Sequence, residues 1–299
     1  MGVGRVRAVS AALSPLPHRV VRHLGAMGGR IAHGRSDTQR AMAERHMARV
    51  VNGDPEAVDE TAREAARRLF ERYGTYTAET LWIRERRLRA VYEELEIDGL
   101  AYWDEARSLG RGVILALPHI GNWEFAAIYP LMQGVRLLAV AEELADRAMV
   151  EWFTEMRGRF GIEVVLADGD PSLTRQLLKA LADDAAVALV TDRDVTGTGV
   201  PVEFFGERTL MPMGPGALAR LSGAPLLPVA CYLAEEGHRI VVRPPVDVPR
   251  TKDRRSDGAA GVQALAREFE GLIRADPDQW HLLQPQWPSD PGWRWGSVG

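Results

Sequence analysis

Residues 112–125 read GVILALPHIGNWEF, and this stretch decides the fold. The apolar run at 112–117 is short enough to be a strand that is buried on both faces. Pro118 ends the run, and Gly121-Asn122 provide a tight turn before a segment of helical composition. A buried strand, a turn and a helix in this order begin a βαβ unit, so the stretch predicts an α/β fold.

The alternation of short apolar runs with helical segments continues along the chain. Further strands are expected at 136–141, 162–166 and 186–191, with helices at 122–132, 146–160 and 171–183 between them. A later section predicts strands at 200–205, 225–233 and 239–243 and helices at 214–221 and 258–274. Upstream, residues 55–95 are rich in Ala, Glu, Arg and Leu and predict one long helix or two stacked helices. The pattern indicates one α/β domain whose mixed, largely parallel central sheet is flanked by helices.

The N-terminal 50 residues differ from the rest in charge. They hold nine arginines against Asp37 and Glu44, a formal charge of +7 that leaves −11 for the remainder of the chain. Apolar residues recur there mostly every three or four positions, with an interruption around Pro15 and Pro17, at Val3, Val6, Val9, Leu13, Leu16, Val20, Leu24, Met27 and Ile31. A cationic amphipathic helix of this kind suits an anionic membrane interface. It equally suits a helix that covers the core and keeps its arginines in solvent.

The chain therefore divides into three parts. Residues 1–50 are a basic amphipathic segment that we expect to associate with membranes, and residues 51–287 form the α/β domain. Residues 288–299, with repeated Gly and Pro, are expected to be a flexible tail.

Composition and missing motifs exclude several classes of protein. The 299 residues are 46% hydrophobic and 26% charged, which is typical of globular proteins and unlike collagen, coiled coils or disordered chains. Cys231 is the single cysteine, and no apolar run approaches the roughly 20 residues of a membrane-spanning helix. The motifs of serine hydrolases, P-loop enzymes and dinucleotide enzymes do not occur. The N-terminal arginines lack interleaved aromatic residues, so no nucleic-acid partner is expected.

His119 is the first candidate for a catalytic residue. It lies at the exit of the first strand, where α/β proteins bind ligands, and Glu124 follows five positions later on the next helix. A carboxylate beside a histidine fixes the imidazole tautomer and stabilises the imidazolium, which is the arrangement of a general base. Seven histidines in a chain with 41 acidic residues make about one such spacing expected by chance. The interpretation therefore depends on the strand exit and the turn, and a core or surface histidine is the alternative.

A second polar group follows the strand at 186–191. It consists of Asp192, Arg193 and Asp194, and Glu203 comes in the next strand. Two carboxylates around an arginine could orient the base, bind a polyol or hold a metal, and a solvated turn with an internal ion pair is the alternative. A metal is disfavoured because hard cations need several oxygen ligands and zinc favours His or Cys, which this region lacks. We therefore interpret the group as polar support for the base or for hydroxyl groups.

In combination, these motifs resemble a known family. The stretches HIGNWE (119–124), DRD (192–194), VEFFG (202–206) and PDQWHLLQ (277–284) follow one another as in bacterial late lipid A acyltransferases and actinobacterial phosphatidylinositol mannoside acyltransferases. The resemblance runs from about Phe70 to Trp287. Lipid A enzymes usually carry an N-terminal transmembrane helix, so the amphipathic segment here favours the mannoside branch. Glu124, by contrast, is more common in the lipid A branch.

The resemblance implies transfer of a fatty acyl chain from a thioester to a hydroxyl of a glycolipid. The thioester would be on coenzyme A or acyl carrier protein, and the enzyme would be peripheral at the cytoplasmic face of the plasma membrane. By the same resemblance, His119 deprotonates the hydroxyl, Glu124 orients the imidazole and Asp192 is a second acidic partner. The implied substrate-binding residues are Glu142, Arg157, Arg193, Asp194 and Glu203. No cofactor or metal is implied, and the expected partners are the acyl thioester, the glycolipid and an anionic membrane surface.

Two other readings stay open. Lysophospholipid acyltransferases share the His-x4-acid spacing, but they follow it with a Glu-Gly-Thr-Arg type phosphate motif that this chain lacks. A membrane-binding scaffold with a vestigial site would be favoured by a buried, fully hydrogen-bonded His119 with no apolar tunnel leading to it.

Overall fold

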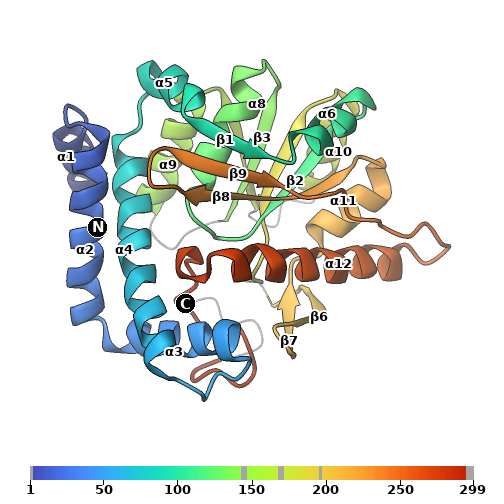
Figure 1. Cartoon of the computed structure of the whole chain (residues 1–299). Helices are drawn as coiled ribbons and strands as arrows, with labels where there is room; N and C mark the ends of the chain where they lie inside the picture. The colour runs from blue at the N-terminus through green and yellow to red at the C-terminus, as the bar shows by residue number, and fades with distance from the viewer. Residues whose placement is uncertain (1–2, 143–146, 168–171, 195–196, 294–299) are drawn as a thin grey trace.

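A central sheet organises the molecule, whose computed structural model describes residues 3–142, 147–167, 172–194 and 197–293 (Figure 1). The strand order is β1-β9-β8-β2-β5-β3-β4, and β8 pairs with β9 in antiparallel fashion while the other neighbours run parallel. The strands are β1 (Leu95–Asp98), β2 (Val113–Leu117), β3 (Leu137–Glu142), β4 (Ile162–Ala167), β5 (Ala186–Val190), β8 (Leu226–Leu233) and β9 (His238–Val242). The structure confirms the predicted α/β class and the mixed, largely parallel sheet.

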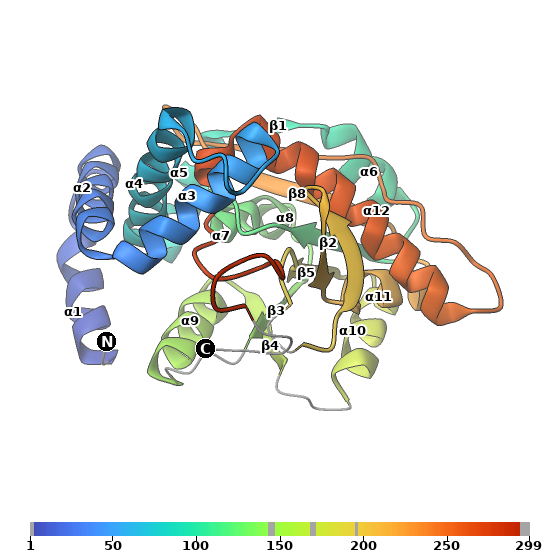
Figure 2. The ribbon, with the colours of Figure 1, turned by 90° about the horizontal axis from the view of Figure 1, so that it is seen from below.

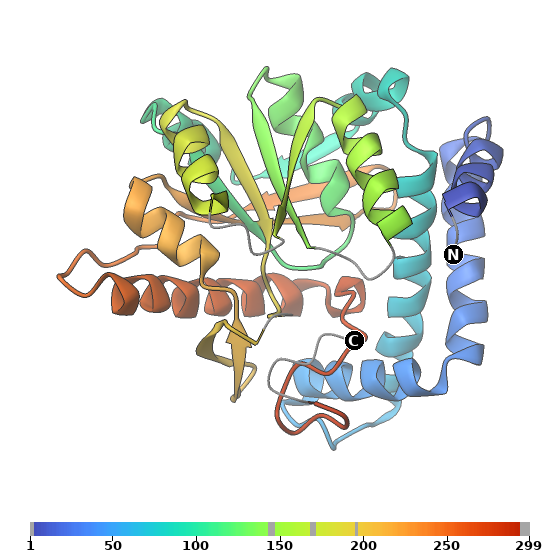
Figure 3. The ribbon, with the colours of Figure 1, turned by 180° about the vertical axis from the view of Figure 1, so that it is seen from behind.

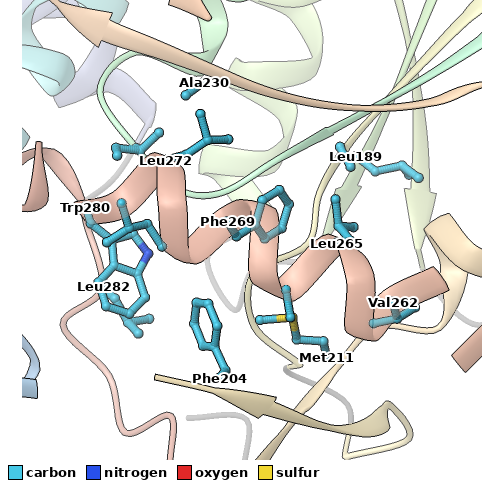
Figure 4. Close-up of a cluster of buried hydrophobic side chains, with 14 of the residues drawn as sticks. Leu189, Phe204, Met211, Ala230, Val262, Leu265, Phe269, Leu272, Trp280 and Leu282 are labelled. Carbon is cyan, nitrogen blue, oxygen red and sulfur yellow. The ribbon is translucent and has the colours of Figure 1, made fainter. Parts of the chain in front are cut away.

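Helices cover both faces of this sheet (Figures 1 and 3). All five residues of β2 are buried, and they alternate between two apolar clusters, with Ile114 in one and Leu115 in the other. The Leu115 side is covered by α5 (Leu88–Glu93), α6 (Leu100–Ser108), α7 (Trp123–Ala126), α8 (Ile128–Met132) and α9 (Arg147–Arg159). The Ile114 side is covered by α10 (Leu173–Ala182), α11 (Gly214–Ser222) and α12 (Arg254–Ala275). Figure 4 shows Leu265 and Phe269 of α12 in the cluster that includes Leu189 of β5.

The N-terminal helices stand at one end of the sheet (Figure 1). They are α1 (Val3–Leu13), α2 (His18–Arg35), α3 (Asp37–Asn52) and α4 (Glu60–Trp82). The predicted interruption at Pro15 and Pro17 is confirmed as the break between α1 and α2. Glycines allow α2 and α4 to pack closely, because a Cβ on Gly29 would lie 2.0 Å from the Phe70 carbonyl oxygen. No helix in the described part of the chain is long and apolar enough to cross a bilayer.

Two strands were not expected from the sequence. Residues 95–98 form β1 rather than the end of a helix, because the 55–95 region holds α4, a short 3-10 helix η1 (Glu85–Arg87) and α5 before the chain turns into the sheet. The second is β7 (Glu207–Met211), which pairs with β6 (Val200–Phe204) in a separate two-stranded hairpin. Both strands are short and rich in polar residues, with the sequences LEID for β1 and ERTLM for β7, so they lack the continuous apolar run that marks a buried strand.

The C-terminal segment is packed rather than loose over its described residues. After α12, a 3-10 helix η2 (Pro277–Gln279) leads into a stretch that passes between α3 and α9 (Figure 2). The carboxylate of Asp290 contacts His46, and the Ser289 hydroxyl accepts a hydrogen bond from Arg49. Side chains on α3 thus contact Ser289 and Asp290, within the segment that is expected to be a flexible tail. Residues 294–299 of that tail lie outside the described part.

Candidate active site

His119 and Asp192 meet because their strands are neighbours in the sheet. Leu117 of β2 lies opposite Val190 of β5, so the residues two positions beyond each strand emerge side by side. The Nδ1 atom of His119 lies 2.5 Å from one carboxylate oxygen of Asp192. The His119 backbone amide donates to the other oxygen at 3.0 Å, and Trp280 Nε1 donates to that same oxygen at 2.8 Å. Three donors thus hold the carboxylate in place.

The surroundings keep Asp192 ionised. Its side chain is fully buried, which by itself would raise the pKa of the carboxyl group. The imidazole of His119 and the hydrogen bonds from His119 and Trp280 outweigh burial, and the net pKa lies below the usual value. An ionised partner accepts the Nδ1 hydrogen, so Nε2 of a neutral His119 is the atom that can take a proton. That Nε2 makes no hydrogen bond with any residue that the structure describes, and the side chain is 19% exposed.

Glu124 does not orient His119, contrary to the expectation from the spacing. Its carboxylate forms a two-pronged ion pair with Arg157 of α9, with contacts of 3.0 Å to Nε and 2.5 Å to Nη2. The physical reason is the sheet register, which places Asp192 against the imidazole, while α7 carries Glu124 toward α9. Burial lowers the pKa of Arg157, but the adjacent Glu124 raises it above the usual value, so the guanidinium stays charged.

An apolar pocket of about 400 Å³ opens beside His119. Helices α1, α4 and α9, strand β3 and the C-terminal segment all contribute to its wall. The apolar lining includes Val6, Leu81, Trp123, Val140, Trp152, Phe153, Val190 and Leu282. Polar side chains also line the pocket, among them Arg157, Arg193, Gln284 and three threonines. A mostly apolar pocket with a few convergent polar groups is the usual form of a site for a small or chain-like ligand.

The remaining predicted residues are in different places. Arg193 lines the pocket, and Asp194 accepts a hydrogen bond at 2.8 Å from the backbone amide of Gly199, so its carboxylate shapes the following turn. Glu203 faces solvent on β6 outside the pocket lining, because the buried side chains of that strand are those at alternate positions. Its expected role in substrate binding is therefore not supported by its position. Glu142 ends β3, and its side chain lies outside the described part of the structure.

Comparison with known proteins gives the family. A model of the bacterial lipid A biosynthesis acyltransferase family matches residues 5–289. The chain belongs to this family. Phosphatidylinositol mannoside acyltransferases from two Mycobacterium tuberculosis strains, CDC 1551 / Oshkosh and H37Rv, are 36% identical over 284 residues, which cover 93% of this chain and 86% of each relative. The protein of that name from Mycolicibacterium smegmatis is 36% identical over 247 residues, covering 82% of this chain and 79% of its own.

The candidate site also includes residues that the motif analysis did not assign to it. Trp280 holds Asp192, and Gln286 donates to the Asp192 backbone carbonyl at 3.1 Å. Tyr76, Trp123 and His281 form an aromatic wall in which the rings of Tyr76 and Trp123 are 4.2 Å apart. The motif at 277–284 marked this segment, but only folding shows that it lies against the loop after β2. Among the described residues, no cluster of three His, Cys, Asp or Glu side chains could hold a metal ion.

Proposed function

We propose that this acyltransferase moves a fatty acyl chain from a thioester to a hydroxyl of a phosphatidylinositol mannoside. The observation that carries the proposal is the pairing of His119 with ionised Asp192 at the wall of an apolar pocket. The pocket has the chemistry to hold an acyl chain next to a base. The printed names of the mycobacterial relatives favour the mannoside lipid as the acceptor.

The chemistry that follows is base-catalysed attack on the thioester. Nε2 of His119 takes the proton of the acceptor hydroxyl while the hydroxyl oxygen bonds to the thioester carbonyl carbon. When the carbon–sulfur bond breaks, the departing thiolate takes the proton from the imidazolium. Asp192 stabilises the imidazolium between these two steps, and a positioned base of this kind contributes about 10²- to 10⁴-fold in rate. No covalent acyl-enzyme is needed.

The ion pair of Glu124 and Arg157 has a binding role in this proposal. Arg157 lines the pocket, and its guanidinium is held in one orientation by two contacts to the same carboxylate. A fixed guanidinium keeps donors available for the hydroxyl or phosphate oxygens of a polar lipid headgroup. Glu124 thus supports substrate binding, and the proton transfer belongs to His119 and Asp192.

The proposal includes peripheral attachment to an anionic membrane at its cytoplasmic face. Five apolar side chains of α1 and α2 are 42–53% exposed: Val9, Val20, Leu24, Met27 and Ile31. On α2 they follow one another every three or four residues, so they lie along one face of the helix. Arginines at positions 5, 7, 19, 30 and 35 of the same two helices are also exposed. Exposed apolar stripes beside arginines are typical of helices that lie in a membrane interface.

A transfer assay tests the reaction and the branch together. Purified protein is given labelled palmitoyl-CoA, or palmitoyl acyl carrier protein, with either a phosphatidylinositol mannoside extract or a lipid A precursor. We expect label on the mannoside lipid that disappears in the variant His119→Ala. Transfer to the lipid A precursor alone would contradict the mannoside lipid as acceptor and assign the protein to the lipid A branch. Absence of His119-dependent transfer with every combination would contradict the proposal and favour a scaffold.

A further inference from the structure

His281 lies against the catalytic loop and faces the same pocket. It follows η2, and its backbone amide donates to the carbonyl oxygen of His119 at 2.7 Å. Both imidazoles line the pocket, and both lie next to the indole of Trp123, with ring centroids 5.2 Å away for His119 and 5.9 Å for His281. The two histidines are therefore neighbours at the place where the thioester and the hydroxyl would meet.

Both ring nitrogens of His281 are buried without a hydrogen-bond partner in the described structure. Among the histidines that the structure describes, only His281 has both ring nitrogens buried and without a partner. The residue is 7% exposed, and the rings of Tyr73, Tyr76 and Trp123 surround it at centroid distances of 5.0–5.9 Å. Burial, reinforced by the charge of His119, lowers the pKa of His281 to about 3, so the ring is neutral at physiological pH. Leaving such a group unsatisfied costs folding free energy, which calls for a function.

Backbone amides near His119 are already used within the protein. The amide of His119 donates to Asp192, and those of Ile120, Gly121 and Asn122 donate to backbone carbonyls at 2.7–2.9 Å. The amides of His281 and Leu282 are likewise engaged. Many acyl-transfer enzymes bind the oxyanion with such amides, but none of these six is available. Outside these six, the stabilisation can come from a side chain beside the loop or from the first amides of α7, those of Trp123 and Glu124.

Two threonine hydroxyls on the opposite wall of the pocket are also committed, while Tyr73, Tyr76 and Thr154 contribute further hydroxyl groups to the lining. Thr77 and Thr80 of α4 each donate to a backbone carbonyl one turn earlier in the helix, at 2.8 Å. Arg157 is held by Glu124 through Nε and Nη2, and its remaining donors are the ones proposed above to bind the lipid headgroup. A neutral imidazole carries one N–H, and His281 has no partner within the described structure to receive it.

We propose that His281, as a neutral imidazole, donates its N–H to the thioester carbonyl oxygen as that oxygen becomes an oxyanion. This role rests on the proposed acyl transfer and adds a second catalytic histidine to it. When the hydroxyl oxygen bonds to the carbonyl carbon, its proton passes to His119 and the carbonyl π electrons move to the oxygen that His281 contacts. Collapse of the intermediate restores the carbonyl, breaks the carbon–sulfur bond and returns the proton to sulfur. His281 keeps its own proton throughout.

Two substitutions separate this role from a structural one. His281→Phe retains an aromatic ring but removes both nitrogens, and His281→Gln retains an N–H donor. We expect kcat of His281→Phe to fall about 10²- to 10³-fold, the usual effect of losing one oxyanion donor, with the KM for palmitoyl-CoA within threefold of wild type. Because two unsatisfied nitrogens are removed, its melting temperature should equal or exceed that of the wild type. His281→Gln should recover part of kcat.

Other results would overturn the role. A His281→Phe variant with kcat within threefold of wild type would do so, and so would equal losses of kcat and melting temperature in both variants. If transfer depends on His119 but not on His281, only this inference fails. If the wild type shows no His119-dependent transfer, the proposed function fails.

A spectroscopic measurement reads the hydrogen bond without turnover. In the His119→Ala background, palmitoyl-CoA labelled with ¹³C at its carbonyl is bound and the carbonyl stretch is recorded by difference infrared spectroscopy. A hydrogen bond from the His281 N–H polarises the thioester carbonyl. We therefore expect the carbonyl stretching frequency to be lower in His119→Ala than in the double variant His119→Ala/His281→Phe. Identical frequencies would contradict the proposed contact.

Discussion

Two His–Asp pairs in this molecule have the same chemical groups and different surroundings. His119 pairs with Asp192 at the sheet edge, and its second ring nitrogen faces the pocket. His46 of α3 pairs with Asp290 through Nε2 at 3.1 Å, while its Nδ1 lies 3.2 Å from the Leu282 carbonyl oxygen. Both side chains of the second pair are fully buried. The difference teaches that a carboxylate partner does not make a histidine a base, and that an open second nitrogen is also required.

Substituting each histidine should give opposite effects, and this is the largest difference we expect. His119→Ala should lower kcat by about 10²- to 10⁴-fold with little change in melting temperature, because its side chain is partly exposed at the pocket. His46→Ala should lower the free energy of unfolding by about 2–4 kcal/mol, because it leaves a cavity and removes a hydrogen bond from a buried carboxylate. Its kcat should stay within twofold of wild type below the unfolding transition.

Steady-state kinetics and calorimetric melting of both variants check this contrast. A large loss of kcat in His46→Ala, at a temperature where the protein is folded, would contradict the predicted contrast between the two histidines.

Substituting the aspartate of each pair tests the same contrast, with a smaller expected effect on kcat. Asp192→Asn removes the charge that stabilises the imidazolium and can reverse the tautomer of His119, so kcat should fall about 10²- to 10³-fold. Asp290→Asn, the matched control, should leave kcat within twofold. Pre-steady-state measurement of thiol release by each variant checks the prediction. If Asp192→Asn releases thiol at nearly the wild-type rate, another group must orient His119, and Glu124 would be the first to test.

The site could be predicted from the sequence only as far as its parts are local. The apolar run of β2, its turn and His119 are contiguous, so the strand exit and the candidate base were found. Glu124 is expected to orient the imidazole and Asp192 to be a second acidic partner, but Asp192 is the carboxylate that reaches His119, through the β2–β5 pairing across 73 residues of chain. Spacing along the chain favoured Glu124, but the sheet, not the spacing, sets which carboxylate meets the imidazole.

Other differences have local signals that could have been read more closely. On β6 the buried residues are Val200, Val202 and Phe204, and this alternation places Glu203 on the solvent side. The buried nitrogens of His281 had no signal of their own, because its surroundings come from α4, the loop after β2 and the C-terminal segment. Such a site is made by packing between distant segments, which a single sequence does not display.

Acid should reveal the structural role of the His46–Asp290 pair as a loss of folding stability. The pKa of Asp290 is lowered from 3.8 to about 2, because hydrogen bonds and charge from His46 and amide donors from Gln286 and Trp287 outweigh its burial. A depressed folded-state pKa contributes stability that is present above the unfolded value and lost as pH falls through the folded value. About 2 kcal/mol of unfolding free energy should therefore disappear between about pH 4 and pH 2. Urea unfolding across this range, with Asp290→Asn as control, measures it, and equal slopes in both proteins would contradict the assignment.

The exposed stripe on α2 extends the comparison from buried pairs to apolar surface residues, with the smallest expected effect. Ile31 is 53% exposed on α2, and Leu221 is 45% exposed on α11 at the other side of the molecule (Figure 1). If α2 enters the membrane interface, Ile31→Asp should weaken binding to anionic vesicles by about 1–2 kcal/mol, roughly five- to thirtyfold, whereas Leu221→Asp should leave it unchanged. Neither substitution should lower the melting temperature, because both side chains are already in water.

Vesicle sedimentation at low and high salt checks the predicted change in membrane binding, since attraction by the arginines of α1 and α2 is screened over about 10 Å at 0.1 M salt. Equal binding by both variants would contradict the membrane role of α2 and leave the stripe to a different partner.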